Sequence, residues 1–382
     1  MTAHMSTHKP KKIFFTLDTL ANAGTEKSVL DILSHFSDGT NVTVIYFFRG
    51  DDLKEAYEKA GIPLRYEPIS GRFPLLKGVL RLRKILKAEK PDMVVSSILR
   101  ANLISRVACW LTGTKLVGTF VSDSYSDLRK SSFSIKRKLG FYFYYRLDRL
   151  TAGIPVGWIS NSQCIRESNC QYLGIATGKV EVIYRGRNPE KFRVKENRLL
   201  PGQFRFVYVG RMLETKGVGE LLEAFAITAQ EFPFASLDMY GKGNYESKAK
   251  EKISRLGINE KVRMHGLVPN GWEKHYEADC FVFPSWYEGF SGSVVEAMMV
   301  GIPIIASDIP MNLEAVTPDV NALVFKVRDA HDLAEQMKKA IRDYDTMCRM
   351  AKQAREEALK RFDIKVIAAQ YENYLHRHIA GA

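Results

Sequence analysis

Short apolar runs alternate with longer amphipathic segments along the whole chain. Runs rich in β-branched and aromatic residues predict buried strands, in the first half at 12–17, 41–48, 92–97, 115–121 and 157–162. The second half repeats them at 204–210, 234–241, 261–266, 280–285 and 302–307. Helical spacing separates these runs, as at 26–36, 75–90, 135–150, 218–232 and 245–257. Strands that alternate with helices form parallel sheets, so we expect an α/β fold with two Rossmann-like, doubly wound sheets.

The length of the chain predicts two domains, because 382 residues exceed what one hydrophobic core usually fills. A polar stretch that contains prolines and glycines is the expected join. We therefore expect a first domain at 1–187, a linker at 188–203 and a second domain at 204–362. Residues 363–382 continue with helical spacing, and we expect this helix to pack back on the first domain.

The composition is that of an ordinary folded protein, with 46% apolar and 26% charged residues. Its five cysteines are scattered, without a C-x-x-C pair or a zinc-ligand spacing, which favours a reducing compartment. The N-terminal stretch holds only a short apolar run broken by Asp18, so we expect neither a signal peptide nor a membrane span there. A cytoplasmic protein is the expectation.

Positive charge gathers in the first half of the chain. Residues 1–190 hold 29 Lys and Arg against 17 Asp and Glu, a net of +12, whereas residues 191–382 have a net of +1. This asymmetry predicts an anionic partner for the first half: a membrane surface, a nucleic acid or an acidic substrate. Nucleic acid is disfavoured, because no nucleic-acid-binding motif accompanies the charge.

Residues 129–149 concentrate this charge, with seven Lys or Arg, one Asp and six aromatic residues. A basic helix with an aromatic face predicts an element that docks on an anionic membrane surface, near a lipid-linked acceptor. The alternative is a helix that packs its aromatic residues on the domain core and exposes its cations. A second basic helix is expected at 77–90.

Candidate ligand-binding residues follow the expected strands, because ligands of open α/β sheets bind beyond the carboxyl ends of the strands. Arg211 directly follows one strand, and Lys216 with Gly217 precedes the next helix. Two cations beside the free amides of a helix N-terminus predict a site for a diphosphate. The alternative is that both cations are solvated on a surface loop.

The stretch "WYEGFSGSVVEAM" places Glu288 and Glu296 on either side of a glycine-rich turn. Gly289 and Gly292 argue against one continuous helix, so the first glutamate is expected at a strand end and the second inside a helix. The carboxylate of Glu288 could then accept hydrogen bonds from ligand hydroxyls. Ser293 and Glu296 fit a capping box, which by itself would explain Glu296 structurally.

A third candidate follows the first strand, in "NAGTEKSVLDIL". Gly24 precedes a helix that Thr25 or Ser28 could cap, and a tight glycine turn there would let the backbone approach a ligand. Glycines are common in such turns, so this stretch is informative only together with the other two.

Together these stretches resemble the retaining GT-B glycosyltransferases of the GT4 family (glycosyl transferases group 1). The matches are Arg211 with Lys216, Glu288 with Glu296, "GIPIIASD" at 301–308 and "NAGTEKSVLDIL" at 22–33. The resemblance extends over nearly all of the second half of the chain, and over the first half only in outline. The resemblance implies the GT-B architecture, in which two Rossmann-like domains face a cleft.

The resemblance also implies a nucleotide-sugar donor held mainly by the second domain, with no metal or other cofactor. Arg211 and Lys216 would bind the diphosphate, Glu288 the hydroxyls of the donor sugar, and Glu296 the ribose. The pocket around them would be lined by Gly24, Gly289, Phe290, Ser291 and Gly292. The implied reaction moves a hexose-type sugar from a UDP- or GDP-sugar onto a glycan acceptor with retention of configuration. Lipid-linked glycans of cell-surface polysaccharide or lipopolysaccharide assembly are one class of such acceptors.

One position departs from the family pattern. Many relatives have a histidine after the strand expected at 115–121, and Val121 stands there in this chain, followed by Ser122 and Asp123 as candidate replacements. This departure keeps a catalytically silent sugar-nucleotide-binding module as an alternative. A GT-B epimerase that acts on the sugar nucleotide itself is a further alternative. A dinucleotide-dependent oxidoreductase is disfavoured, because "GKGNYE" at 241–246 lacks the third glycine of G-x-G-x-x-G.

Overall fold

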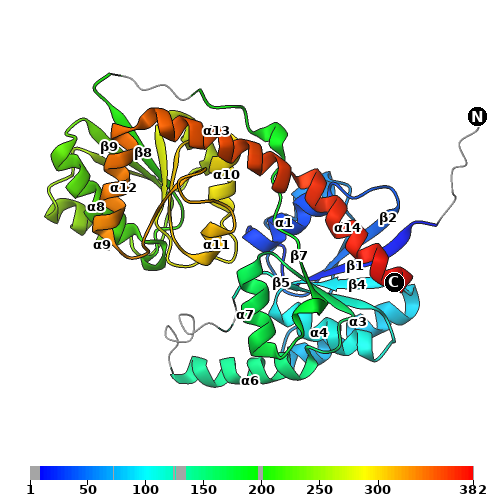
Figure 1. Ribbon diagram of the computed structural model, residues 1–382. Coiled ribbons are helices and arrows are strands. Elements are labelled where there is room, and N and C mark those ends of the chain that lie inside the picture. The colour runs from blue at the N-terminus through cyan, green and yellow to red at the C-terminus, as the bar shows by residue number, and fades with distance from the viewer. Residues whose placement is uncertain (1–8, 72, 124, 126–134, 197–200, 382) are drawn as a thin grey trace, which may run out of the picture. The chain divides into compact units, whose positions relative to one another are not determined.

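The computed structural model describes residues 9–71, 73–123, 125, 135–196 and 201–381. The chain divides into two compact units (Figure 1). The first contains the residues up to Gly186 together with those from Ile364 onward, and the second is Arg187–Asp363. Each unit is built around one parallel β-sheet, which confirms the α/β fold with two Rossmann-like sheets.

The sheet of the first unit has seven parallel strands in the order β3-β2-β1-β4-β5-β6-β7. They are β1 (Lys11–Leu17), β2 (Thr40–Tyr46), β3 (Leu64–Tyr66), β4 (Met93–Ser96), β5 (Leu116–Phe120), β6 (Gly157–Ser160) and β7 (Val180–Val182). In the centre of the sheet, Ile13 pairs with both Val42 and Met93. The inner strands are buried on both faces, which explains why they are near-continuous apolar runs in the sequence.

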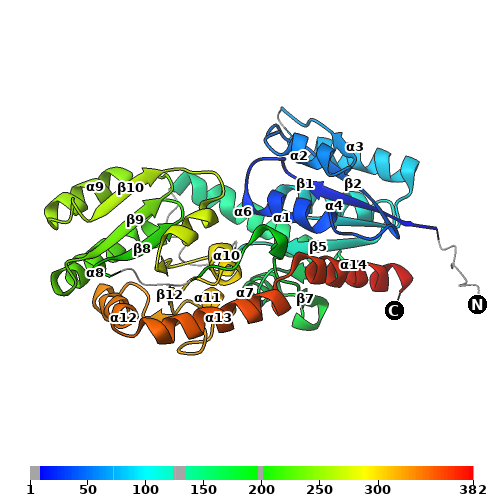
Figure 2. The same ribbon diagram turned by 90° about the horizontal axis from the view of Figure 1, so that it is seen from above.

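Helices cover both faces of this sheet. They are α1 (Gly24–Leu33), α2 (Lys54–Lys59), α3 (Pro74–Glu89), α4 (Leu99–Trp110), α6 (Ile135–Thr151), α7 (Gln163–Leu173) and α14 (Ile364–Ala380). The C-terminal helix α14 packs beside α1, where Ile367 and Leu375 join the same core as Ile32 and Leu33. On the opposite face lie α3 and α4, and α6 continues that layer beside α4 (Figure 1, Figure 2).

The second unit has a six-stranded parallel sheet in the order β10-β9-β8-β11-β12-β13. Its strands are β8 (Phe204–Val209), β9 (Ala235–Tyr240), β10 (Val262–Gly266), β11 (Cys280–Phe283), β12 (Ile304–Ser307) and β13 (Leu323–Phe325). Its α-helices are α8 (Val218–Glu231), α9 (Glu246–Arg255), α10 (Gly292–Val300), α11 (Pro310–Leu313), α12 (Ala330–Arg342) and α13 (Tyr344–Arg361). Between α12 and α13, Asp343 accepts a hydrogen bond from the Thr346 amide and caps α13.

The ten strands expected from the sequence are all present, and each end lies within two residues of its predicted place. The strands β3, β7 and β13 were not predicted, because each has only three residues and lies at a sheet edge. The helix α4 was not predicted either. Its buried residues include Asn102, Ser105 and Arg106, so it lacks the polar stripe of an amphipathic helix.

The basic segment predicted at 129–149 is described only in part. Residues 129–134, and the side chains as far as 139, lie outside the described residues. In the remainder of α6, Phe141 and Tyr145 pack against Tyr125, whereas Tyr142 and Phe143 are exposed. In the described part, some aromatic side chains thus pack on the unit and others face solvent, and membrane docking stays a prediction. Of the helices that the structure describes, none is long and apolar enough to cross a membrane.

The packing of α14 predicts a stability effect confined to the first unit. Leu375 is fully buried, so we expect Leu375→Ala to lower the free energy of unfolding of that unit by about 2–5 kcal/mol. Hydrogen–deuterium exchange should speed up in β1, while β8 of the second unit keeps its protection. Val366→Ala, at a position of the same helix that is 40% exposed, is the control. Unchanged exchange in β1 would contradict the packing of α14 in this core.

Candidate functional site

The loop after β8 carries the two predicted cations. Arg211 follows Gly210, and its backbone carbonyl accepts a hydrogen bond from the hydroxyl of Tyr208 at 2.8 Å. Burial raises the pKa of Tyr208, and the nearby carboxylate of Glu288 raises it further, so the hydroxyl stays protonated and donates. The side chain of Arg211 is exposed. The loop thus fixes the backbone of Arg211 and leaves its guanidinium at the surface.

Lys216 ends a short 3₁₀ turn, Glu214–Lys216, just before α8. Gly217 then adopts a left-handed conformation with φ of 67°, and a Cβ there would lie 2.0 Å from the carbonyl oxygen of Pro284. Only glycine therefore allows this loop to approach the end of β11 so closely. The approach brings Lys216 to the predicted glutamate.

Lys216 and Glu288 form an ion pair, with 2.5 Å between Nζ and Oε1. The ammonium also lies 3.3 Å from the carbonyl oxygen of Tyr287 and 3.5 Å from Oγ of Ser285. The two charged side chains are only 11% and 16% exposed. The solvated-loop alternative is therefore wrong for Lys216, because its ammonium is held at the carboxyl ends of β8 and β11.

Glu296 lies inside α10, but the predicted capping box is wrong. The helix begins at Gly292, so Ser293 is already inside its first turn, and the N-cap residue Ser291 makes no side-chain capping bond. The hydroxyl of Ser291 instead donates to Oδ1 of Asn312 at 2.5 Å. Glu296 forms an ion pair with Arg187, in which Nε lies 2.8 Å from Oε1.

The glycine-rich turn from Gly289 to Gly292 connects the two glutamates. Phe290 is buried and packs on Phe362 with 5.7 Å between ring centroids, which anchors the middle of the turn. A Cβ on Gly292 would lie 2.4 Å from Nη2 of Arg187, so the guanidinium lies directly over the start of α10. The first amides of a helix have no partner within it, so an anion-binding end and an arginine meet here.

In the first unit, Gly24 opens α1, and the predicted capping by Thr25 or Ser28 is wrong. The N-cap residue is Ala23, and no side chain caps the helix. Thr25 instead accepts a hydrogen bond from Nη2 of Arg185 at 3.3 Å. Arg185 also lies 3.3 Å from a Cβ built on Gly24, so a cation lies beside this glycine.

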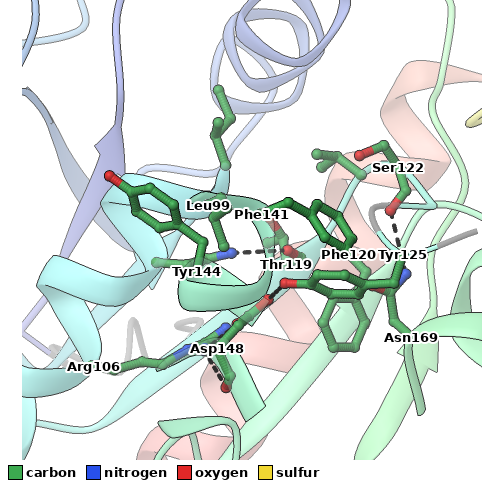
Figure 3. A pocket seen from close by; sticks show the side chains of 13 residues that line it. Leu99, Arg106, Thr119, Phe120, Ser122, Tyr125, Phe141, Tyr144, Asp148 and Asn169 are labelled. Atoms are coloured by element: carbon green, nitrogen blue, oxygen red, sulfur yellow. Dashed lines mark hydrogen bonds and ion pairs between the residues drawn. The ribbon is translucent and has the colours of Figure 1, made fainter. Parts of the chain in front are cut away.

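Val121 and its neighbours lie at the carboxyl end of β5, where a cavity of about 140 Å³ opens (Figure 3). Its wall combines aromatic rings of Phe120, Phe141 and Tyr144 with polar groups. Its floor holds an ion pair between Arg106 and Asp148, and the hydroxyl of Tyr125 donates to the same carboxylate.

The two candidate replacements for the family histidine differ in their surroundings. Asp123 is buried and accepts a hydrogen bond from Oγ of Ser168 at 2.8 Å, so its carboxylate fixes α7. Ser122 lines the cavity, and its backbone carbonyl accepts a hydrogen bond from the side-chain Nδ2 of Asn169 at 3.3 Å. Of the two candidates, Ser122 is therefore the one that lines the cavity, and its role in place of the histidine stays a prediction.

Two residues of the second unit that were not predicted from the sequence contact the predicted site residues Glu296 and Ser291. Arg187 was assigned to the end of the first domain, although it pairs with Glu296. Asn312 had no predicted role, although it holds Ser291. For Arg187, the signal available in the sequence was its place in a cation-rich run, "YRGRNPEK".

The fold and this strand-end site define a GT-B glycosyltransferase. One family model, "Glycosyl transferases group 1", matches residues 190–357, and another, "Glycosyltransferase Family 4", matches residues 23–191. Together the two models span the chain from residue 23 to residue 357. The chain belongs to this GT4-type family of glycosyltransferases, as its motifs indicated.

Relatives and solved structures agree with this assignment. An uncharacterised glycosyltransferase of Methanocaldococcus jannaschii is 25% identical over 66% of this chain, and the match spans 65% of that protein, just under two thirds of its length. The N,N'-diacetylbacillosaminyl-diphospho-undecaprenol alpha-1,3-N-acetylgalactosaminyltransferase of Campylobacter jejuni is 26% identical over 78% of this chain and 80% of its own length. The crystal structure of Anabaena HepE in complex with UDP matches with a TM-score of 0.81 over 96% of this chain and 99% of that one. At 21% identity, this last likeness shows the fold alone.

The close approach at Gly217 generates a prediction. Gly217→Ala should destabilise the second unit by about 2 kcal/mol or more, because the new methyl group would overlap the carbonyl of Pro284. Gly257→Ala is the matched control, because Gly257 has nearly the same φ, 68°, but nothing within 4 Å of an added Cβ. Thermal unfolding of both variants separates the overlap from the backbone strain that they share. Equal losses of stability would contradict the importance of this contact.

Proposed function

We propose that the protein transfers a hexose-type sugar from a UDP- or GDP-sugar to a glycan acceptor, with retention of configuration and without a metal ion. The observation that carries the proposal is the partly buried pair of Lys216 and Glu288, which follow the two adjacent strands β8 and β11. A cation held at a strand end suits the diphosphate, and the carboxylate beside it suits sugar hydroxyls.

The proposed chemistry needs positive charge more than any other group. The bond between the anomeric carbon and the diphosphate oxygen breaks, a bond to the acceptor oxygen forms, and the acceptor proton passes to the diphosphate. Negative charge therefore grows on the leaving group in the transition state, where Lys216 and Arg211 stabilise it. These two cations supply the stabilisation for which other transferases use a metal ion.

The amides of the glycine-rich turn complete the proposed donor site. The backbone of Gly289, Ser291 and Gly292 would line the sugar and phosphates, and Gly24 stays a predicted donor-binding residue. Glu296 would accept hydrogen bonds from the ribose hydroxyls. Its pairing with Arg187 supports this role, because the contact holds the carboxylate in one position at 23% exposure.

The relatives favour one donor class and one acceptor class. HepE was crystallised with UDP and with UDP-glucose, which favours a UDP-sugar. The Campylobacter enzyme is named for a diphospho-undecaprenol substrate, which favours a lipid-linked glycan. A lipid-linked acceptor would bring the protein to the cytoplasmic surface of an anionic membrane, and the basic segment 129–149 was predicted to dock there.

The donor and the catalytic cation can be tested together. Wild-type protein, incubated with a panel of UDP- and GDP-sugars and a chelator, should release nucleoside diphosphate from one donor by slow transfer to water. Lys216→Ala should lower this rate by about 10²–10³-fold, because one preorganised donor to the leaving group is lost. Arg255→Ala, an exposed arginine at the end of α9, is the control.

The outcomes separate the proposed transferase from its alternatives. Release that depends on added divalent metal would contradict the metal-independent mechanism. A silent panel combined with tight binding of UDP would favour a sugar-nucleotide-binding module. Conversion of the donor sugar without any acceptor would favour an epimerase.

The ribose contact can be tested by binding alone. Glu296→Gln should weaken the binding of UDP about 10-fold or more, because hydrogen bonds to a charged partner are worth about 1.5–3 kcal/mol. Titration calorimetry with UDP and with 2′-deoxy-UDP forms a double-mutant cycle between the carboxylate and the ribose hydroxyl. The substitution should weaken the binding of 2′-deoxy-UDP much less than that of UDP. Equal losses for both ligands would contradict the contact.

A further inference from the structure

Large apolar side chains are exposed along one layer of helices in the first unit. The outer helix face, as we name it, consists of the exposed residues of α6, of α3 with the residue before it, and of the end of α4 with the residue after it. Figure 1 shows where these three helices lie. The apolar members of the outer helix face are Phe73, Leu76, Leu80, Trp110, Leu111, Tyr142, Phe143 and Leu150, which are between 42% and 82% exposed. Soluble proteins rarely gather so many exposed apolar residues on one side unless that side binds something.

The helix α3 shows the arrangement most clearly. Its inward face is already complete, since Leu82, Ile85 and Leu86 are at most 4% exposed. Leu76 and Leu80 lie one turn apart on the opposite side and are 58% and 54% exposed. These leucines therefore contribute nothing to the core of the unit.

Cations continue the same outward side of α3. Lys84 and Lys87 follow Leu80 at helical spacing and are exposed, while Lys77 and Arg81 flank the leucines. Long basic side chains of this kind can reach past an apolar stripe while their charged ends stay in a polar layer. The side is thus apolar in its first half and cationic in its second.

No free carboxylate on these three helices offsets the cations, as far as the described residues go. The parts of these helices whose side chains the structure describes contain nine Lys and Arg and two carboxylates, Glu89 and Asp148. Of these cations, Arg100 is already paired with Asp18 outside the three helices. Glu89 is bound by Lys12 at 2.9 Å and by Arg65 at 2.6 Å. Asp148 is buried and paired with Arg106. Lys84 and Lys87 therefore face solvent without a competing anion on their own layer.

We propose that the outer helix face docks on an anionic membrane surface, with its leucines and aromatic rings among the headgroups and its cations on the lipid phosphates. Apolar side chains beside unopposed cations are the pattern of interfacial helices. A nucleic acid would neutralise the cations but would give Leu76 and Leu80 nothing to pack against. This docking rests on the membrane part of the proposed function and deepens it. The contact is extended from the segment 129–149 to the outer helix face, with α3 as its central described helix.

The test is co-sedimentation of the full chain with vesicles. Wild-type protein should bind vesicles of phosphatidylglycerol mixed with phosphatidylcholine, bind phosphatidylcholine alone weakly, and dissociate as salt is added. Lys84→Gln with Lys87→Gln should weaken binding about 25-fold, at about fivefold per cation near the surface. Leu76→Ser with Leu80→Ser should weaken it about tenfold or more while leaving the salt dependence unchanged.

Matched controls lie on the other face of the sheet. Lys54→Gln with Lys59→Gln removes two exposed cations of α2, and Val366→Ser removes an exposed apolar side chain of α14. Both should bind vesicles like the wild type. Wild-type protein that ignores anionic vesicles would overturn the proposal, and so would leucine variants that bind as tightly as the wild type. The latter result would show that the cations alone account for the binding, without contact of the leucines with the headgroups.

Donor chemistry gives an independent readout. The α3 variants should release nucleoside diphosphate in vesicle-free buffer at the wild-type rate, because α3 contributes nothing to the donor site. Vesicle binding without any donor turnover would refute the proposed transferase and leave the docking surface standing. Donor turnover without vesicle binding would refute the docking surface and leave the proposed transferase standing.

Discussion

The proposed donor site depends on a buried hydrogen-bond network centred on Asn312. Its amide donates to both the carbonyl and the hydroxyl of Ser307 at 3.0 Å, and its oxygen accepts from Ser291. The hydroxyl of Ser307 in turn donates to the carbonyl of Ser285 at 2.5 Å. All four residues are at most 1% exposed, so breaking one bond would leave a buried polar group unsatisfied at about 1–3 kcal/mol. The network thereby ties Ser285, before Glu288, and Ser291, after it, to β12 and α11, so Glu288 stands between two fixed points.

The charged side chains beside this turn then determine which ligand the proposed site can bind. Each predicted glutamate keeps one cation in place, Glu288 holding Lys216 and Glu296 holding Arg187. A partly buried cation without a partner would be unstable, and these pairs remove that problem while no ligand is bound. A bound diphosphate would bring new negative charge to Lys216, whose position is already set. The site therefore needs little rearrangement when charge develops, which is the condition for strong electrostatic stabilisation.

The sequence predicted most of the sheets because buried parallel strands are long apolar runs, whereas the three-residue edge strands carry no such period. It also predicted that Lys216 and Glu288 follow strands. Their contact could not be predicted in the same way, because it requires β8 and β11 to be neighbours although β9 and β10 separate them in the chain. The capping box failed for a similar reason. The helix begins at Gly292, one residue before Ser293, so Ser293 is not at the N-cap position. The actual N-cap residue, Ser291, donates its hydroxyl to the distant Asn312 instead of capping the helix.

The return of the chain to its first unit affects the order in which the protein can fold during synthesis. The core beside α1 includes Ile364, Ile367, Tyr371, Tyr374 and Leu375, all from α14. Residues 187–363 leave the ribosome before this helix does, so the second unit can complete its core while the first still lacks a wall. Until α14 arrives, the apolar surface of α1 is open to water and to other chains. The older half of the nascent chain is thus the last to become fully protected, and it is the half that chaperones would need to shield.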